Sequence, residues 1–163
     1  MISEKKTVVA DASSLIGLSK IGKLHILRDL YDEVNIPQSV YDEVVCKFQR
    51  DSEHIKKAEY LRLRKIKDED LVTFLLGYLG KGEAEVLVLS KELKADLILI
   101  DEKKARKIGR RSGFEVIGIL GLLLVARNVG LIPAVKPYIE RLLQEGFRLS
   151  EKIVEEFLKK AGE

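Results

Sequence analysis

The stretch Asp96-Leu97-Ile98-Leu99-Ile100-Asp101 decides the fold class of this chain. Four consecutive apolar residues between two acids predict a short strand that is buried on both faces, as in a parallel sheet. The run Thr7-Val8-Val9-Ala10, which is followed by Asp11, has the same character. Three weaker strands are expected at residues 33–36, 63–66 and 114–117.

The segments between these strands have helical periodicity. Pro37 closes the second strand and is expected to open a helix, because the first helical turn does not need the missing N–H of proline. Cys46 on that helix is expected to be a small core residue. Alternating helices and apolar strands predict an α/β protein with three layers, α/β/α, around a central, mainly parallel sheet of four to five strands. The helices are expected at residues 13–18, 23–30, 37 onward, 51–62, 68–79, 83–94, 102–111, 120–128, 133–144 and 150–160.

Length and composition limit the class of protein. The chain has 163 residues, of which 46% are hydrophobic and 34% charged, as expected for one globular domain. The longest apolar stretch, residues 116–126, is too short to span a bilayer, which takes about 20 apolar residues. The first six residues lack the apolar segment of a signal peptide. We therefore expect a cytoplasmic protein without a membrane partner.

Metal chemistry in this chain would depend on carboxylates. The sequence contains one cysteine and two histidines, too few for a cysteine or histidine metal site. Carboxylate ligands favour hard cations, so Mg²⁺ or Mn²⁺ is expected, as one or two ions. The net charge of +3 permits a nucleic-acid partner without requiring one.

Two acids follow the two strongest strands. Asp11 comes directly after the first strand and Asp101 after the most apolar one, so both are expected at the rim formed by the carboxyl ends of the strands. Each could serve only as a helix N-cap. Two neighbouring carboxylates, however, repel each other unless a cation lies between them, which favours a functional role for the pair.

Two further acids could reach the same rim. Glu83 opens a helix after Gly80-Lys81-Gly82, where glycine allows a close backbone approach, although an acid also suits a first helical turn through the helix dipole. On the helix after Pro37, Asp42 and Glu43 flank the apolar stripe about equally. Periodicity leaves the choice between them open.

A basic run begins beside Asp101. It contains no acid, and it could hold a nucleic-acid backbone or simply form a solvated helix face. Lys81 between its two glycines is a further candidate phosphate contact. The run contains Lys103, Lys104, Arg106, Lys107, Arg110 and Arg111.

Four segments together resemble the PIN domain, the fold of metal-dependent ribonucleases that include the VapC-type toxins. The segments are VVADASSLI from Val8, IPQSVYDEV from Ile36, LGKGEAE from Leu79 and LILIDEKKAR from Leu97. Their order and spacing fit the family up to about residue 130. The resemblance implies a PIN-like catalytic domain over residues 1–130, with the helices of residues 131–163 packed on the same domain.

The resemblance also implies roles for individual residues. Asp11, Glu43, Glu83 and Asp101 fall on the four acidic positions, which are catalytic and metal-binding, and position 83 carries Glu where the family usually has Asp. Ser13 falls on a hydroxyl position that orients a water or a phosphate. Glu102 is an additional acid beside Asp101.

The expected function is therefore a Mg²⁺- or Mn²⁺-dependent endoribonuclease, as the toxin of a toxin–antitoxin pair. RNA is the expected partner, and the resemblance adds a small antitoxin protein and a homodimer. A nucleic-acid-binding or regulatory PIN-like domain with little hydrolytic activity is the alternative. A phosphatase-like or phospho-receiver domain with Asp11 as acceptor is a third, weaker interpretation.

Overall fold

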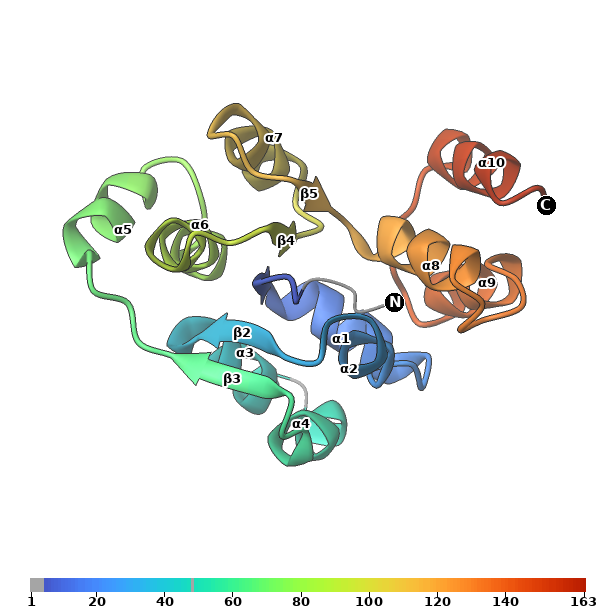
Figure 1. Ribbon diagram of the computed structural model, residues 1–163, viewed down its shortest axis with the longest axis horizontal. Helices are drawn as coiled ribbons and strands as arrows, with labels where there is room; N and C mark the ends of the chain where they lie inside the picture. The colour runs from blue at the N-terminus through green and yellow to red at the C-terminus, as the bar shows by residue number, and fades with distance from the viewer. Residues whose placement is uncertain (1–4, 48) are drawn as a thin grey trace.

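The computed structural model describes residues 5–47 and 49–163, and a sheet of five parallel strands lies at its centre (Figure 1). β1 is the middle strand, and it pairs in parallel with β4 through Val9 and Ile98. The α/β fold with a parallel sheet is thereby confirmed. In spatial order the strands are β3 (Leu61–Arg64), β2 (Val34–Pro37), β1 (Val8–Ala10), β4 (Leu97–Leu99) and β5 (Val116–Ile117).

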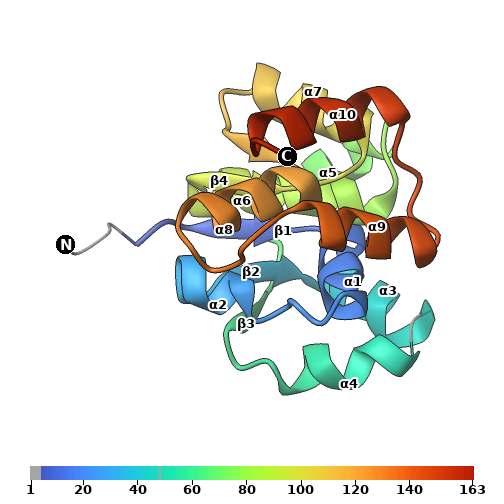
Figure 2. The same cartoon turned by 90° about the vertical axis from the view of Figure 1, so that its right-hand side faces the viewer.

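Helices cover both faces of this sheet (Figures 1 and 2). One face carries α5 (Glu69–Leu75), α6 (Lys81–Leu93) and α7 (Lys103–Arg111). The other carries α1 (Ala12–Lys20), α2 (Ile26–Tyr31) and α8 (Ile119–Asn128). The remaining helices are α3 (Gln38–Lys47), α4 (Gln49–Lys57), α9 (Lys136–Gln144) and α10 (Glu151–Lys160). No helix in the described part of the chain is long and apolar enough to cross a membrane.

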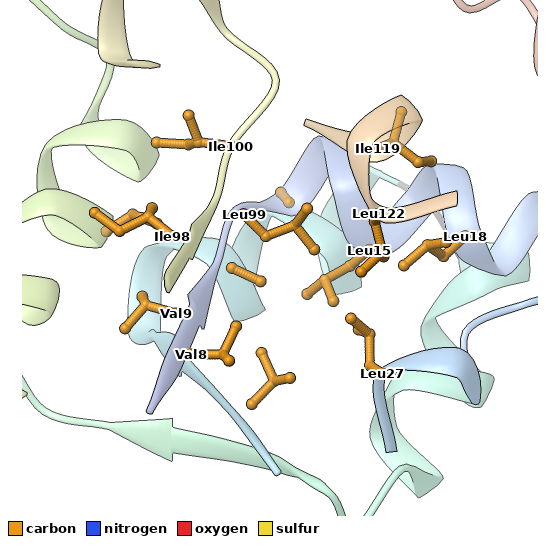
Figure 3. Close-up of a cluster of buried hydrophobic side chains, with 14 of the residues drawn as sticks. Val8, Val9, Leu15, Leu18, Leu27, Ile98, Leu99, Ile100, Ile119 and Leu122 are labelled. Carbon is orange, nitrogen blue, oxygen red and sulfur yellow. The ribbon is translucent and has the colours of Figure 1, made fainter. Parts of the chain in front are cut away.

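The core lies between the central strands and the helices on either side (Figure 3). Val8, Val9 and Ile98 have no exposed surface, as the continuous apolar runs require of strands covered on both faces. Ile139 and Leu142 of α9 belong to the same buried cluster. The division of the chain at residue 130 stays a prediction.

Several element boundaries differ from those expected. The helix expected over residues 51–62 ends at Lys57, because the chain then pairs with β2 as β3. Pro37 is the last residue of β2 rather than the first of a helix. Cys46 is exposed, so its expected place in the core is wrong. The buried positions of α3 are Val40 and Val44, one helical turn apart, and Cys46 points away from them.

Candidate metal and nucleic-acid site

The strand ends bring Asp11 and Asp101 to one rim of the sheet. Ala10 of β1 is paired with Leu99 of β4, and the two acids follow these residues by one and two positions. The Asp11 N–H still donates to the Leu99 carbonyl at 2.9 Å, so the ladder continues to the rim. The prediction that both acids lie at the rim formed by the carboxyl ends of the strands is confirmed, and the two strands are neighbours in the sheet.

Asp11 is both a helix cap and a link between the two strands. Its side chain is 4% exposed. Oδ1 accepts the Ser14 N–H at 2.9 Å, which caps α1, and Oδ2 accepts the Asp101 N–H at 3.0 Å. The capping role and the place at the rim therefore belong to the same carboxylate.

Asp101 is held from two sides. Its Oδ1 accepts the N–H of Ile119, the first residue of α8, at 2.9 Å. Its Oδ2 accepts the Ser14 hydroxyl at 2.9 Å. Ser14 is fully buried, and it thus contacts Asp11 through its backbone and Asp101 through its side chain.

Sequence reasoning missed Ser14 and selected Ser13 instead. Ser13 is exposed and stays a predicted contact for water or phosphate. A signal for Ser14 exists in its spacing. The third residue after an N-cap acid donates its N–H to the cap, which places Ser14 beside Asp11, but only the packing of α1 shows that its hydroxyl faces Asp101.

Burial and charge act together on Asp11. Desolvation, followed by the negative charge of Asp101, raises the pKa of the Asp11 carboxyl from 3.8 to about 7, although hydrogen bonds from Ser14 and Asp101 oppose the rise. Ionising this carboxyl beside Asp101 therefore costs free energy. A divalent cation would offset that cost, and all-oxygen donors fit Mg²⁺ or Mn²⁺.

Glu43 lies on α3 and Glu83 lies on α6. Both carboxylates are close to the glycines at the start of α6. A Cβ atom at Gly82 would lie 3.4 Å from Glu43 Oε2, and one at Gly80 would lie 2.7 Å from Glu83 Oε2. Gly80 has an ordinary φ of −65°, so glycine supplies space for the carboxylates rather than an unusual backbone conformation. The two glycines therefore admit one acid each to this part of the rim.

The four acids are not gathered into one cluster. Glu43 Oε1 lies 3.6 Å from Lys47 Nζ on its own helix. Across residues 5–47 and 49–163, no group of three or more His, Cys, Asp or Glu side chains is placed to hold a metal ion. Asp11 and Asp101 are the pair that the fold brings together, and the ligand roles of Glu43 and Glu83 stay predictions.

Glu102 acts as a helix cap. Its two carboxylate oxygens accept the N–H groups of Lys104 at 3.1 Å and Ala105 at 2.6 Å. These bonds orient the start of α7 directly after Asp101. The additional acid that the sequence placed beside Asp101 therefore positions the basic helix in this structure.

The basic side chains of α7 are mostly exposed. Lys104 Nζ lies 5.9 Å from the ring centre of Tyr78, and an Arg110 guanidinium N–H donates to the Val116 carbonyl at 3.3 Å. Lys81 is exposed at the start of α6. The remaining exposed cations of α7 are Lys103, Lys107 and Arg111.

A cavity of about 590 Å³ gives access to Asp101 from the side of α8 and α10. Arg106 and Arg110 line it together with Asp101. One wall thus combines a carboxylate that suits a cation with two guanidinium groups that suit phosphate. A phosphodiester could enter here beside the acid pair.

A family model described as a PIN domain matches residues 7–163, nearly the whole chain. No curated protein matches the chain.

Proposed function

The chain belongs to the PIN domain family, and from this premise we propose that it is an endoribonuclease that depends on Mg²⁺ or Mn²⁺. PIN domains are typically nucleases that bind these metals, which supports the class of reaction. RNA as substrate, the antitoxin and the homodimer rest on the resemblance of the sequence.

The observation that carries the proposal is the coupling of Asp11 and Asp101. Two carboxylates share one serine, and the Asp101 backbone also donates to Asp11. A merely structural cap would not need a second acid whose charge raises its pKa. The pair is consistent with an environment built for a cation.

In this proposal, one set of residues holds the metal and another binds the RNA. Asp11 and Asp101 hold the metal, with Glu43 and Glu83 as further ligands, directly or through water. Arg106, Arg110 and the lysines of α7 bind the RNA phosphates beside them. A bound divalent ion supplies a water of lowered pKa and positive charge for the oxygens of the scissile phosphate.

The test is Mn²⁺ binding by calorimetry, together with cleavage of an unstructured RNA. We expect the wild-type chain to bind Mn²⁺ and to cleave RNA, and expect Asp101→Asn to lose both while it remains folded. Asp68→Asn is the matched control, because Asp68 also caps a helix, α5, away from the acid pair. Cleavage that persists in EDTA, or Mn²⁺ binding that survives Asp101→Asn, would refute the proposed site. Mn²⁺ and RNA binding without cleavage would favour the binding-module alternative.

A further inference from the structure

A second cavity opens at the same end of the sheet, where β2 and β3 finish. Its volume is about 710 Å³, within the range of small-molecule sites. The start of α3, the end of β3, and α5 and α6 enclose it. Because all the strands are parallel, it shares the rim on which Asp11 and Asp101 lie.

Glu85 lines this cavity and has no partner for its side chain. The residue is only 7% exposed, yet among the described residues its carboxylate makes no hydrogen bond and no ion pair. The buried side chains of Asp11, Asn35 and Ser90 all have hydrogen-bond partners. The Glu85 oxygens are not fully buried, because Ser39 Oγ is the one fully buried side-chain oxygen or nitrogen without a partner in the described residues. The Glu85 carboxylate is therefore open to a ligand in this cavity.

A second polar group beside the cavity also has no partner, and it is more deeply buried than the Glu85 carboxylate. The Ser39 hydroxyl oxygen is buried and has no hydrogen-bond partner in the described part of the chain, and Ser39 lines the same cavity. Glu85 and Ser39 come from α6 and α3, two helices that pack against each other. Glu85 offers a carboxylate acceptor to the cavity, whereas the buried Ser39 hydroxyl, which can donate and accept, reaches a ligand only if its side chain turns.

The remaining residues that line the cavity are partly apolar and partly charged. Ile66 and Val72 are buried apolar residues that offer apolar contact area, with the exposed Leu63 and Leu76 also in the lining. Lys65 and Lys81 are exposed, and within residues 5–47 and 49–163 neither forms an ion pair. The other charged lining residues are Asp42, which accepts from Gln38, Arg64, which binds Asn35, and the exposed Glu69.

We propose that this cavity binds a guanine base of the RNA substrate, with the Glu85 carboxylate accepting the N1–H and the N2–H of the base. This inference rests on the proposed ribonuclease function and names the base that the enzyme would recognise. Guanine is the RNA base with two adjacent donors on one edge, which match the two oxygens of a carboxylate. In this arrangement Lys65 and Lys81 line the cavity where they can bind the phosphate attached to the guanosine.

The other bases fit this carboxylate less well. In adenine and in cytosine, the ring nitrogen next to the amino group carries a lone pair instead of a hydrogen. A carboxylate oxygen repels this lone pair. Uracil has a single N–H between two carbonyl oxygens, so it offers the carboxylate one donor instead of two. Discrimination by one bidentate contact of this kind amounts to about tenfold or more.

Nucleotide binding to the intact chain in EDTA tests the inference without metal or cleavage. Calorimetry with GMP, IMP, AMP, CMP and UMP should show GMP binding at least about tenfold tighter than AMP, CMP or UMP. IMP lacks the 2-amino group and should bind the same site about tenfold more weakly than GMP. This comparison changes only the ligand, so it holds even if a variant fails to fold.

Glu85→Gln replaces one acceptor oxygen by a donor and should weaken GMP binding about tenfold or more, with AMP binding not reduced. Glu69→Gln is the matched control, because it removes the same charge from an exposed position on the same cavity. We expect that variant to bind GMP like the wild type. Equal affinities for GMP and AMP, absence of GMP binding, or equally weakened GMP binding in the two variants would overturn the inference.

A second arm separates RNA from free nucleotide. Oligoadenylate and the same oligomer with one internal guanine are compared for binding in EDTA. Tighter binding of the guanine-containing RNA, abolished in Glu85→Gln, supports a substrate site. GMP binding without such a preference would contradict it. RNA cleavage without guanine preference would refute only this inference, and guanine binding without cleavage would refute only the proposed nuclease.

Discussion

The Ser14 hydroxyl donates a 2.9 Å hydrogen bond to Asp101 Oδ2, while the Ser14 N–H donates to Asp11 Oδ1 at the same distance. One residue in the first turn of α1 thus fixes two carboxylates that are 90 positions apart in the chain. The orientation of α1 relative to β4 therefore sets how the two acids face each other.

Ser14→Ala should weaken Mn²⁺ binding about tenfold, because groups that orient metal ligands typically contribute that much to affinity. It should also lower the free energy of unfolding by about 1 kcal/mol, since Asp101 Oδ2 loses its buried donor. Calorimetry and urea unfolding measure the two effects. Ser13→Ala, one residue away and exposed, is the control and should change neither quantity. A larger drop in Mn²⁺ affinity in Ser13→Ala than in Ser14→Ala would contradict the orienting role of Ser14.

Much of this site could be predicted because it depends on strand ends. Asp11 and Asp101 each follow a continuous apolar run, and parallel strands place their carboxyl ends on one rim. Periodicity could not select Ser14, because its partner follows β4 and the hydrogen bond depends on how α1 packs. It could not reveal Glu85 either, since the burial of that residue comes from α3 and α5 packing against α6.

The pKa of Asp11 predicts a pH dependence of stability. A carboxyl with a pKa of about 7 when folded and 3.8 when unfolded keeps its proton in the folded state across that interval. The free energy of unfolding should therefore fall as pH rises from about 4 to about 7, by at most about 1.4 kcal/mol per pH unit from this group. Above pH 7 this contribution should be constant.

Urea unfolding in EDTA between pH 5 and pH 8 measures this slope. Asp11→Asn should reduce the slope, since its amide stays neutral, and should lose one of the two backbone hydrogen bonds that the carboxylate accepts at every pH. Asp68→Asn, at an exposed cap, should keep the wild-type slope. An unchanged slope in Asp11→Asn would show that other groups govern the pH dependence.

Charge on α7 should control RNA affinity through binding of the phosphates. Lys104→Glu with Lys107→Glu should weaken binding of single-stranded RNA and reduce its salt dependence, by a slope of about 0.7 for each phosphate that the helix no longer neutralises. Filter binding between 50 and 200 mM salt, roughly the interval over which such interactions weaken most visibly, measures both. The same double reversal at Lys152 and Lys159 of α10 is the control. If both pairs weaken binding equally, only the net charge matters and α7 is a solvated face.

Gly118 keeps space open for the Asp101 carboxylate. A Cβ atom there would lie 2.7 Å from Asp101 Oδ1 and 2.9 Å from an Arg106 guanidinium nitrogen. The backbone at Gly118 is extended, with φ −98°, so alanine is acceptable to the chain and the conflict falls on the side chains. Because Asp101 Oδ1 also accepts the Ile119 N–H, moving it breaks that bond.

Gly118→Ala should therefore weaken Mn²⁺ binding by about tenfold or more through displacement of Asp101, without removal of any acid. Stability should fall by only about 1–3 kcal/mol, the usual cost of added bulk in a packed site, and the chain should remain folded. Gly77→Ala is the control, because a Cβ atom there meets the Phe74 carbonyl at an ordinary 3.5 Å. Calorimetry with Mn²⁺ on the two variants distinguishes the outcomes. If Gly118→Ala binds Mn²⁺ like the wild type, the position of Asp101 does not limit metal binding, and the ligands must be sought among Glu43, Glu83 and their neighbours.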